Sequence, residues 1–251
     1  MIPRKAFFCW GGGEMPWIRQ KSVESFHRHN PSWDVEIINV DGDSKGDIVR
    51  KSDRIRYERL AEEGGAYFDT DIFFLKPLDA LMELIGDSDT VVCFELTAPM
   101  NLIKADGTIE RNAIQSRFYS VASLMSCPSN DFWREAYNYS CRPDVLSEPD
   151  YQACGIWTMT ERFKSLDNAM EEFPHRKFHN LHKRAFLPVA YDDVRSLYRQ
   201  GSDGLVDELR SDPEVFGVHW FGGDNITRIS ELWTPDLYWK DCAMGRLLGE
   251  A

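Results

Sequence analysis

Apolar and polar positions in the first 95 residues follow two alternating patterns. Short runs rich in β-branched and aromatic residues predict strands, and each run ends near a glycine, proline or aspartate turn signal. Longer segments between them carry apolar residues at helical spacing. The predicted strands are 5–10, 33–40, 66–75 and 90–96, and the predicted helices are 16–29, 47–62 and 78–85. This alternation predicts an α/β domain with a mostly parallel central sheet.

The pattern is less regular in the second half of the chain. We predict strands at 117–127, 185–190 and 214–221, and helices at 131–140 and 154–170. Residues 99–117 are polar and residues 141–152 contain two prolines, so both stretches are predicted as loop. We find no internal repeat and no low-complexity linker, and therefore expect one domain over residues 1–251.

Composition narrows the class of protein. The 251 residues are 43% hydrophobic and 28% charged, with a net charge of −12, so a nucleic-acid partner is not expected. No apolar run reaches the roughly 18 residues of a membrane helix, and the N-terminus lacks the apolar core of a signal peptide. The six cysteines form no CxxC pair, which favours buried free thiols in a reducing compartment. We expect a cytoplasmic protein without a transmembrane segment.

The most informative segment is GGAYFDTDIFFLKPLD, residues 64–79. Asp69 and Asp71 interrupt an otherwise apolar strand, where carboxylates are costly unless they are paired, hydrogen-bonded or bound to metal. In an extended strand, side chains two residues apart point to the same face. Both could then bind one Mn²⁺ or Mg²⁺ that also takes phosphate oxygens. The alternative is a solvated pair of acids at a strand end.

Asp53 and Arg56 lie three residues apart on the predicted helix before this segment. At that spacing they share a face, and a surface ion pair of small energetic value is the simplest explanation. The functional alternative is that Asp53 accepts a hydrogen bond from a sugar hydroxyl while Arg56 orients it or reaches a phosphate. Spacing alone favours the ion pair.

Residues 52–71 read S-D-x-x-R-Y-x-x-L-x-x-x-G-G-x-Y-x-D-x-D, which resembles the signature of the DXD-containing glycosyltransferase family 32. This family includes initiating mannosyltransferases, capsular polysaccharide enzymes and, more distantly, glucosylating bacterial toxins. The opening IPRKAFFCWGGGEMP also resembles the start of that family. The resemblance covers residues 2–80 well and the remainder only faintly.

The resemblance implies a GT-A fold and a metal-dependent, retaining transfer from a nucleotide sugar, with UDP favoured, to a hydroxyl of a glycan. It implies a nucleotide-sugar-binding half at 1–95, and an acceptor side with a C-terminal metal and diphosphate loop at 96–251. By this resemblance, Trp10, beside Gly11, stacks on the nucleotide base, and Asp53 and Arg56 hold the donor sugar. Tyr67 contacts the donor. Asp69 contacts the ribose and the metal, and Asp71 is a direct metal ligand. Without the resemblance, Trp10 is more simply a core residue.

The segment GVHWFGGDN resembles the family's C-terminal contribution to the diphosphate site. It adds His219 as a third metal ligand, with Trp220 and Asn225, and more weakly Asp224, as further donor contacts. The alternative for His219 is a histidine at the edge of the core. The family's T-G-P segment is missing from EPDYQACGIWTMTERF, where Asp150 and Gln152 are candidates for the group beside the anomeric carbon.

Several alternatives remain open at this stage. Retention can arise by front-face substitution or through a covalent intermediate on a carboxylate such as Asp150. The Asp-x-Asp pair also suits a metal-dependent phosphotransferase or nucleotidyltransferase. Eight tryptophans would suit a non-catalytic carbohydrate-binding module.

Overall fold

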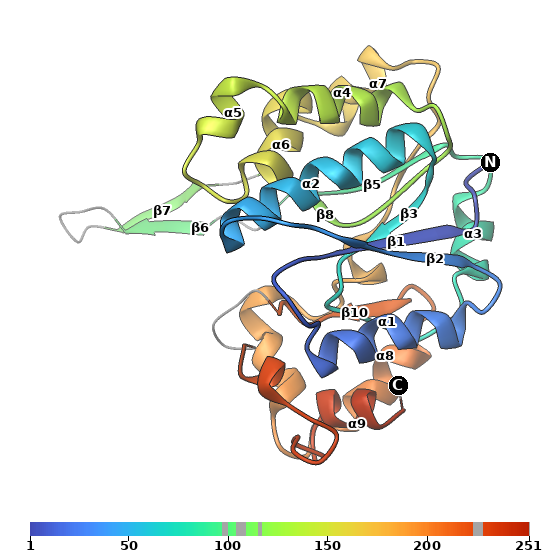
Figure 1. The fold of residues 1–251 in the computed structure, drawn as a ribbon, viewed down its shortest axis with the longest axis vertical. Coiled ribbons are helices and arrows are strands. Elements are labelled where there is room, and N and C mark those ends of the chain that lie inside the picture. The colour runs from blue at the N-terminus through green and yellow to red at the C-terminus, as the bar shows by residue number, and fades with distance from the viewer. Residues whose placement is uncertain (97–99, 104–108, 115–116, 223–227, 251) are drawn as a thin grey trace.

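The computed structural model describes residues 1–96, 100–103, 109–114, 117–222 and 228–250, with side chains outside 95–118. Its centre is a six-stranded sheet in the order β2-β1-β3-β8-β5-β9 (Figure 1). The strands are β1 (Lys5–Trp10), β2 (Asp34–Asn39), β3 (Gly65–Phe68), β5 (Thr90–Leu96), β8 (Arg117–Ser126) and β9 (Phe178–Asn180). Only β8 runs against its neighbours β3 and β5, so the predicted α/β class with a mostly parallel sheet is confirmed.

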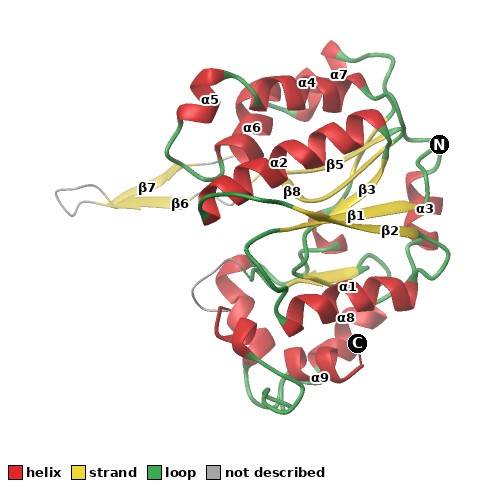
Figure 2. Cartoon of the chain, in the orientation of Figure 1, coloured by secondary structure: helices red, strands yellow, loops and turns green. Residues whose placement is uncertain are grey.

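Helices cover both faces of this sheet (Figure 2). One face carries α2 (Lys45–Glu62), α4 (Asp131–Ser140), α6 (Thr158–Phe163) and α7 (Leu166–Glu172), and the other carries α1 (Trp17–His29) and α3 (Asp79–Ile85). Successive residues of β1 alternate between the two layers: Phe7 packs on the α2 side and Phe8 on the α1 side, both fully buried. Burial on both faces explains why β1 reads as a continuous apolar run.

The C-terminal part forms a second layer of structure under α1 (Figure 1). Its core joins Ile18 of α1 to the 3₁₀ helix η3 (Tyr191–Tyr198), α8 (Leu205–Ser211) and α9 (Ala243–Glu250). Strand β10 (Gly217–His219) leaves this layer and pairs antiparallel with β4 (Ile72–Phe74) in a separate two-stranded sheet. This pairing places His219, at the end of β10, next to the Asp-x-Asp segment.

The glycine pair between α2 and β3 confirms the predicted end of that helix. Gly64 has φ 68° and its N–H donates to the carbonyl of Arg59. Gly65 has φ 98°, and a Cβ there would lie 2.5 Å from the carbonyl oxygen of Lys5. The turn therefore requires glycine, and it places β3 beside β1 with the Asp-x-Asp segment at its carboxyl end.

Most predicted elements of the first half are confirmed, whereas several of the second half are wrong. Within residues 99–117, the strands β6 (Met100–Ile103) and β7 (Ile109–Ile114) pair antiparallel with each other, and the polar composition of this stretch hid both of them. Residues 141–152 contain the helix α5 (Pro143–Ser147). The single helix predicted at 154–170 is three pieces, a π-helical turn η1 (Ala153–Trp157), α6 and α7. Gly155 has non-helical φ and ψ within η1, and Lys164 adopts φ 60° between α6 and α7.

The strand predicted at 185–190 is also wrong. The 3₁₀ turn η2 (Lys183–Ala185) occupies its start, and Pro188 supplies no N–H for a ladder. The carbonyls of Ala185 and Phe186 instead accept single hydrogen bonds from Phe216 and His219. Among the described residues, no helix combines the length and apolar character needed to cross a membrane.

Candidate active site

The Asp-x-Asp segment is a turn between two sheets. Asp69 still belongs to the edge of the central sheet, since its N–H donates to the carbonyl of Ala122 at 2.9 Å. The chain then turns, and β4 begins at Ile72. The predicted continuous strand over 66–75 is therefore wrong, because β3 and β4 lie in different sheets. The two carboxylates therefore lie close together because of this turn, and not because alternate residues of one strand share a face.

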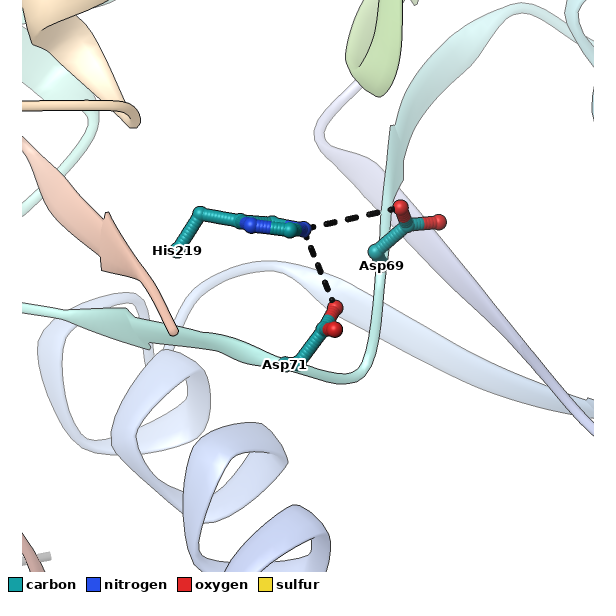
Figure 3. A group of neighbouring side chains, drawn as sticks. All are labelled: Asp69, Asp71 and His219. Atoms are coloured by element: carbon teal, nitrogen blue, oxygen red, sulfur yellow. Dashed lines mark ion pairs between the residues drawn. The ribbon is translucent and has the colours of Figure 1, made fainter. Parts of the chain in front are cut away.

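Pairing of β4 with β10 brings His219 to the two aspartates (Figure 3). His219 lies opposite Ile72 in the ladder, one position from Asp71. Its Nε2 is 3.3 Å from Asp71 Oδ1 and 3.8 Å from Asp69 Oδ2. One potential ligand atom from each of the three residues lies within 4.8 Å of the others. Two carboxylates and an imidazole at this spacing fit a divalent cation such as Mn²⁺ or Mg²⁺.

Electrostatics favour charge separation within this cluster. Burial alone would raise the pKa of Asp71, but His219 and the nearby Arg19 hold it below its usual range. Burial would likewise lower the pKa of His219, but Asp71 and Asp69 outweigh it and raise the pKa to about 9. Asp71 Oδ2 also accepts a hydrogen bond of 2.8 Å from Gly222 N–H. The electrostatics therefore keep Asp71 ionised beside His219, and the Gly222 N–H fixes the orientation of its carboxylate.

A second buried cluster adjoins the first. Asp53 and Arg56 on α2 are 3% and 5% exposed, so the surface ion pair favoured by spacing is wrong. Arg56 Nη2 lies 2.8 Å from Asp53 Oδ1, and Nη1 donates to the carbonyl of Val121 at 2.6 Å. The guanidinium also sits 4.3 Å from the centroid of the Tyr67 ring, whose hydroxyl donates to Asp69 Oδ1 at 2.7 Å. The network links Asp53 to the Asp-x-Asp segment.

The ionisation of Asp53 is finely balanced. Burial raises the pKa of Asp53 to about 7, against the attraction of Arg56, while the charge on Asp69 adds to the rise. The backbone of η1 closes over this carboxyl group: a Cβ on Gly155 would lie 2.7 Å from Asp53 Oδ2. Tyr57 on α2 holds the same turn by donating from its hydroxyl to the carbonyl of Gly155 at 3.0 Å.

Arg19 on α1 is a residue of the site that the sequence reasoning missed. Its guanidinium lies 5.2 Å from the ring centroid of Trp10 and 5.1 Å from that of Trp220. Nη1 donates to the Thr70 hydroxyl at 2.8 Å, and Nε donates to Glu231 at 2.8 Å. Arg19 thus ties the middle residue of the Asp-x-Asp segment to the C-terminal part. The sequence signal was a cation directly after Ile18 on the buried side of a predicted helix.

The remaining predicted donor residues are placed as follows. Trp10 is partly exposed at the end of β1, with its indole N–H donating to the carbonyl of Gly13 at 2.8 Å. Gly11 lies against Val40, whose oxygen would be 2.2 Å from an added Cβ. Trp220 is fully buried and donates to Ser22, so it is a core residue and not a ligand contact, which corrects its predicted role. Asp224 and Asn225 lie outside the described residues.

Asp150 and Gln152, the two residues predicted beside the anomeric carbon, line two different cavities. Asp150 accepts hydrogen bonds from the N–H of Gln152 and from the indole of Trp157, and it lines a cavity of about 290 Å³. Gln152 lines a larger cavity of about 870 Å³, which we call the DXD cavity. The structure therefore separates Asp150 from the candidate metal ligands and keeps Gln152 in the cavity that they line.

The DXD cavity is lined by both buried clusters and by segments from the second half of the chain. At one end it is lined by Asp53, Arg56, Asp69, Asp71 and His219. Its other walls come from η1, from η2 and the residues after it, and from the segment that follows β10; they include Tyr151, Gln152, Gly155, Lys183, Leu187, Tyr191 and Phe221. The volume lies within the range of about 300–1,000 Å³ typical of small-molecule sites.

Residues 15–91 match the family model described as a glycosyltransferase sugar-binding region containing a DXD motif. The matched segment runs from α1 into β5 and contains both Asp69 and Asp71. The match, over less than a third of the chain, identifies this segment as a glycosyltransferase sugar-binding region of the DXD type. The α/β layers place the Asp-x-Asp segment at the carboxyl end of β3, a strand of the central sheet. No curated protein sequence matches the chain.

Solved glycosyltransferase structures resemble the chain at low identity. One is a glycosyltransferase involved in glycosylation of the major capsid of PBCV-1, with 10% identity over 92% of this chain and 100% of that chain and a TM-score of 0.48. GlyE from Streptococcus pneumoniae TIGR4 has 12% identity over 99% of this chain and 62% of its own, with a TM-score of 0.49. An active-site mutant of LgtC has 13% identity over 98% and 95%, with a TM-score of 0.44.

Proposed function

We propose that the chain is a metal-dependent, retaining glycosyltransferase that moves a sugar from a UDP-sugar to a hydroxyl group of a glycan. The observation that carries the proposal is the convergence of Asp69, Asp71 and His219 beside the buried Asp53–Arg56 pair, at one end of a single cavity. Paired carboxylates with an imidazole suit a divalent cation, and an adjoining buried carboxylate and guanidinium suit a sugar and its phosphates.

The metal ligands in this proposal are Asp69, Asp71 and His219. A bound Mn²⁺ or Mg²⁺ would neutralise the charge that develops on the departing nucleoside diphosphate. The chain's own contribution is preorganisation. Asp71 is fixed by Gly222 N–H, and Asp69 is fixed by the Tyr67 hydroxyl. Fixed groups around a developing charge need little rearrangement during the reaction.

The donor sugar lies against the Asp53–Arg56 pair in this proposal. Arg56 is held by Val121 and Asp53, so its guanidinium has little freedom. Asp53 can accept a hydrogen bond from a sugar hydroxyl, and its placement under Gly155 fixes how closely the sugar approaches. Trp10, partly exposed at the end of β1, offers its ring for stacking on the nucleotide base.

Front-face substitution is the mechanism that this arrangement favours. The acceptor oxygen forms a bond to the anomeric carbon on the face from which the diphosphate departs, and its proton passes to the departing phosphate oxygen. No enzyme nucleophile is required. The covalent alternative through Asp150 is disfavoured, because that carboxylate is engaged by Trp157 in a neighbouring cavity.

The test is thermal stability against UDP-, GDP-, dTDP- and CMP-sugars, each with and without Mn²⁺, followed by product analysis with the stabilising donor. A ligand at 100 times its dissociation constant adds about 2.7 kcal/mol of stability. We expect a Mn²⁺-dependent rise in Tm with UDP-sugars and release of UDP. Release of pyrophosphate or inorganic phosphate would instead indicate nucleotidyl or phosphoryl transfer. Sugar binding without metal and without turnover would indicate a carbohydrate-binding module.

A further inference from the structure

Beyond the candidate metal ligands, the wall of the DXD cavity carries a row of aromatic rings. The ring centroids of His219 and Phe221 are 4.3 Å apart at an interplanar angle of 77°. Those of Phe221 and Tyr191 are 5.3 Å apart at 80°. All three residues line the cavity, and exposure rises along the row from 7% at His219 to 57% at Tyr191. The row therefore leads from the buried metal ligands to solvent.

The backbone of Phe221 adopts a conformation that aromatic residues rarely adopt. Its φ is 52°, in the left-handed region, which is costly for a bulky side chain. Two hydrogen bonds hold this turn: Phe221 N–H donates to His219 Nδ1 at 3.3 Å, and Gly222 N–H donates to Asp71 Oδ2 at 2.8 Å. Both acceptors belong to candidate metal ligands. The position of the Phe221 ring is therefore fixed to the reaction centre by a strained turn.

Polar groups for a ligand come from the segment around η1. Gln152 lines the same cavity, and its side-chain amide has no hydrogen-bond partner among the described residues. Tyr151 beside it is 53% exposed. Aromatic rings together with a free amide are the groups that bind pyranose sugars, because a pyranose has an apolar face and a rim of hydroxyl groups.

The donor does not account for this wall. In the proposed function its sugar lies against Asp53 and Arg56, its diphosphate at the Asp-x-Asp segment and its base on Trp10. Trp10 is not among the described residues that line the DXD cavity. The wall of Phe221 and Tyr191 is thus left for the second substrate.

We propose that Phe221 and Tyr191 form the acceptor subsite and that the acceptor group bound there is a pyranose ring, stacked on these two side chains beside the metal ligands. The proposal rests on the transferase function proposed above and deepens it by assigning the acceptor a position and a chemical class. It distinguishes a saccharide acceptor from a serine or threonine hydroxyl of a peptide and from an acyclic lipid alcohol, neither of which carries its hydroxyl on a ring with an apolar face.

The test uses Tyr191→Ala and Tyr191→Phe, with Trp239→Ala as the control. Trp239 is a 51% exposed aromatic outside the residues that line the cavity. The probes are UDP with Mn²⁺ for donor affinity, hydrolysis of the UDP-sugar without acceptor, and transfer to methyl glycosides of glucose, galactose, mannose and N-acetylglucosamine. Because Tyr191 is exposed, the alanine variant is expected to fold, which its Tm will verify.

We expect Tyr191→Ala to raise the acceptor KM about tenfold, the loss expected for one stacking contact. Hydrolysis and UDP affinity should stay within about twofold of wild type, and Tyr191→Phe should keep a near-normal KM because the ring remains. An unchanged acceptor KM in Tyr191→Ala would overturn the proposal. So would an equal loss in Tyr191→Phe, which would assign the role to the hydroxyl.

Two further outcomes would also overturn it. A parallel loss of UDP affinity in Tyr191→Ala would show that the wall binds the nucleotide. Donor hydrolysis without transfer to any glycoside would show that the acceptor is not a pyranose. These failures leave the proposed function standing, whereas a wild-type protein that binds no nucleotide sugar would remove the function itself and this inference with it.

Discussion

The two sides of the active site are built in different ways. The proposed donor side takes Asp53, Arg56, Tyr67 and Asp69 from one continuous stretch, where α2 turns back into β3. The opposite side takes its groups from far along the chain: Gly222 reaches Asp71 across 151 positions, and Glu231 reaches Arg19 across 212. The first side is fixed by local structure, whereas the second depends on the pairing of β4 with β10 and on Arg19. Substitutions on the two sides should therefore have different effects on stability, Mn²⁺ affinity and donor binding.

The largest effect is expected where the two sides meet, at Asp71. Asp71→Asn keeps the shape of the side chain but removes the negative charge that attracts His219, Arg19 and a bound cation. We expect kcat/KM to fall by at least about 10²-fold, since even indirect contacts to metal ligands cost that much. The measurement is UDP release with the identified donor. Asp79→Asn is the control, because Asp79 is an exposed partner of Arg4 at the start of α3; near-normal turnover of Asp71→Asn would refute the assignment.

Arg19 tests the long-range side alone. Arg19→Met removes the hydrogen bonds to Thr70 and Glu231 while keeping an unbranched apolar side chain between Trp10 and Trp220. Charge-assisted hydrogen bonds are worth about 1.5–3 kcal/mol, so Tm should fall by several degrees, and Mn²⁺ affinity should fall about tenfold.

The control for Arg19 is Arg142→Met, which cuts an exposed ion pair with Asp144. A pair of this kind contributes little, so Tm and Mn²⁺ affinity should be unchanged. If Arg19→Met binds Mn²⁺ as wild type does, Arg19 does not position the Asp-x-Asp segment.

Gly155 tests the local side. In Gly155→Ala the added methyl group would lie 2.7–3.0 Å from the carboxyl atoms of Asp53, so Asp53 or η1 must shift. Overpacking of this kind costs about 1–3 kcal/mol, and we expect a lower Tm and a higher donor KM with Mn²⁺ affinity retained. Gly204→Ala is the control, because a Cβ there meets nothing within 4 Å. Equal effects of the two substitutions would argue against a role for Gly155 in placing Asp53.

The smallest expected effect is a pH dependence from Asp53. Its folded-state pKa of about 7 lies above the ordinary 3.8, so the folded protein binds the proton more tightly than the unfolded chain. This group's contribution to stability therefore falls as pH rises from about 4 to 7. The free energy of unfolding of Asp53→Asn relative to wild type should rise over that interval in urea titrations at pH 5, 6 and 7. A pH-independent difference would contradict the assignment.

The same contrast explains how much could be predicted from sequence. The strands and helices of the first half were predictable because apolar periodicity, the glycine pair and Asn30-Pro31 all agree locally. The candidate metal ligands were predictable in identity but not in geometry, since the turn at Asp69–Asp71 and the β4–β10 pairing depend on tertiary contacts. The position of Arg19 directly after Ile18 is only a weak local signal, because its partners Thr70, Trp220 and Glu231 come together only in the folded chain.

Errors in the predicted roles have the same cause. Trp220 was expected to contact the donor from its position beside His219, but adjacent residues of β10 and the following segment face opposite ways, and the indole enters the core. Asp53 and Arg56 resembled a surface pair because helical spacing cannot tell which face of α2 meets the sheet. Asp150 was adjacent in sequence to Gln152, but its carboxylate caps the turn that begins η1.

The most direct measurement is a Mn²⁺ titration followed by electron paramagnetic resonance, with and without UDP, on wild type, Asp71→Asn, His219→Ala and Asp79→Asn. We expect one bound Mn²⁺ per wild-type and Asp79→Asn chain, with tighter binding in the presence of UDP. We expect loss of that binding in Asp71→Asn and weaker binding in His219→Ala. Equal Mn²⁺ binding by all four proteins, or none by wild type even with UDP, would contradict a metal site at Asp69, Asp71 and His219.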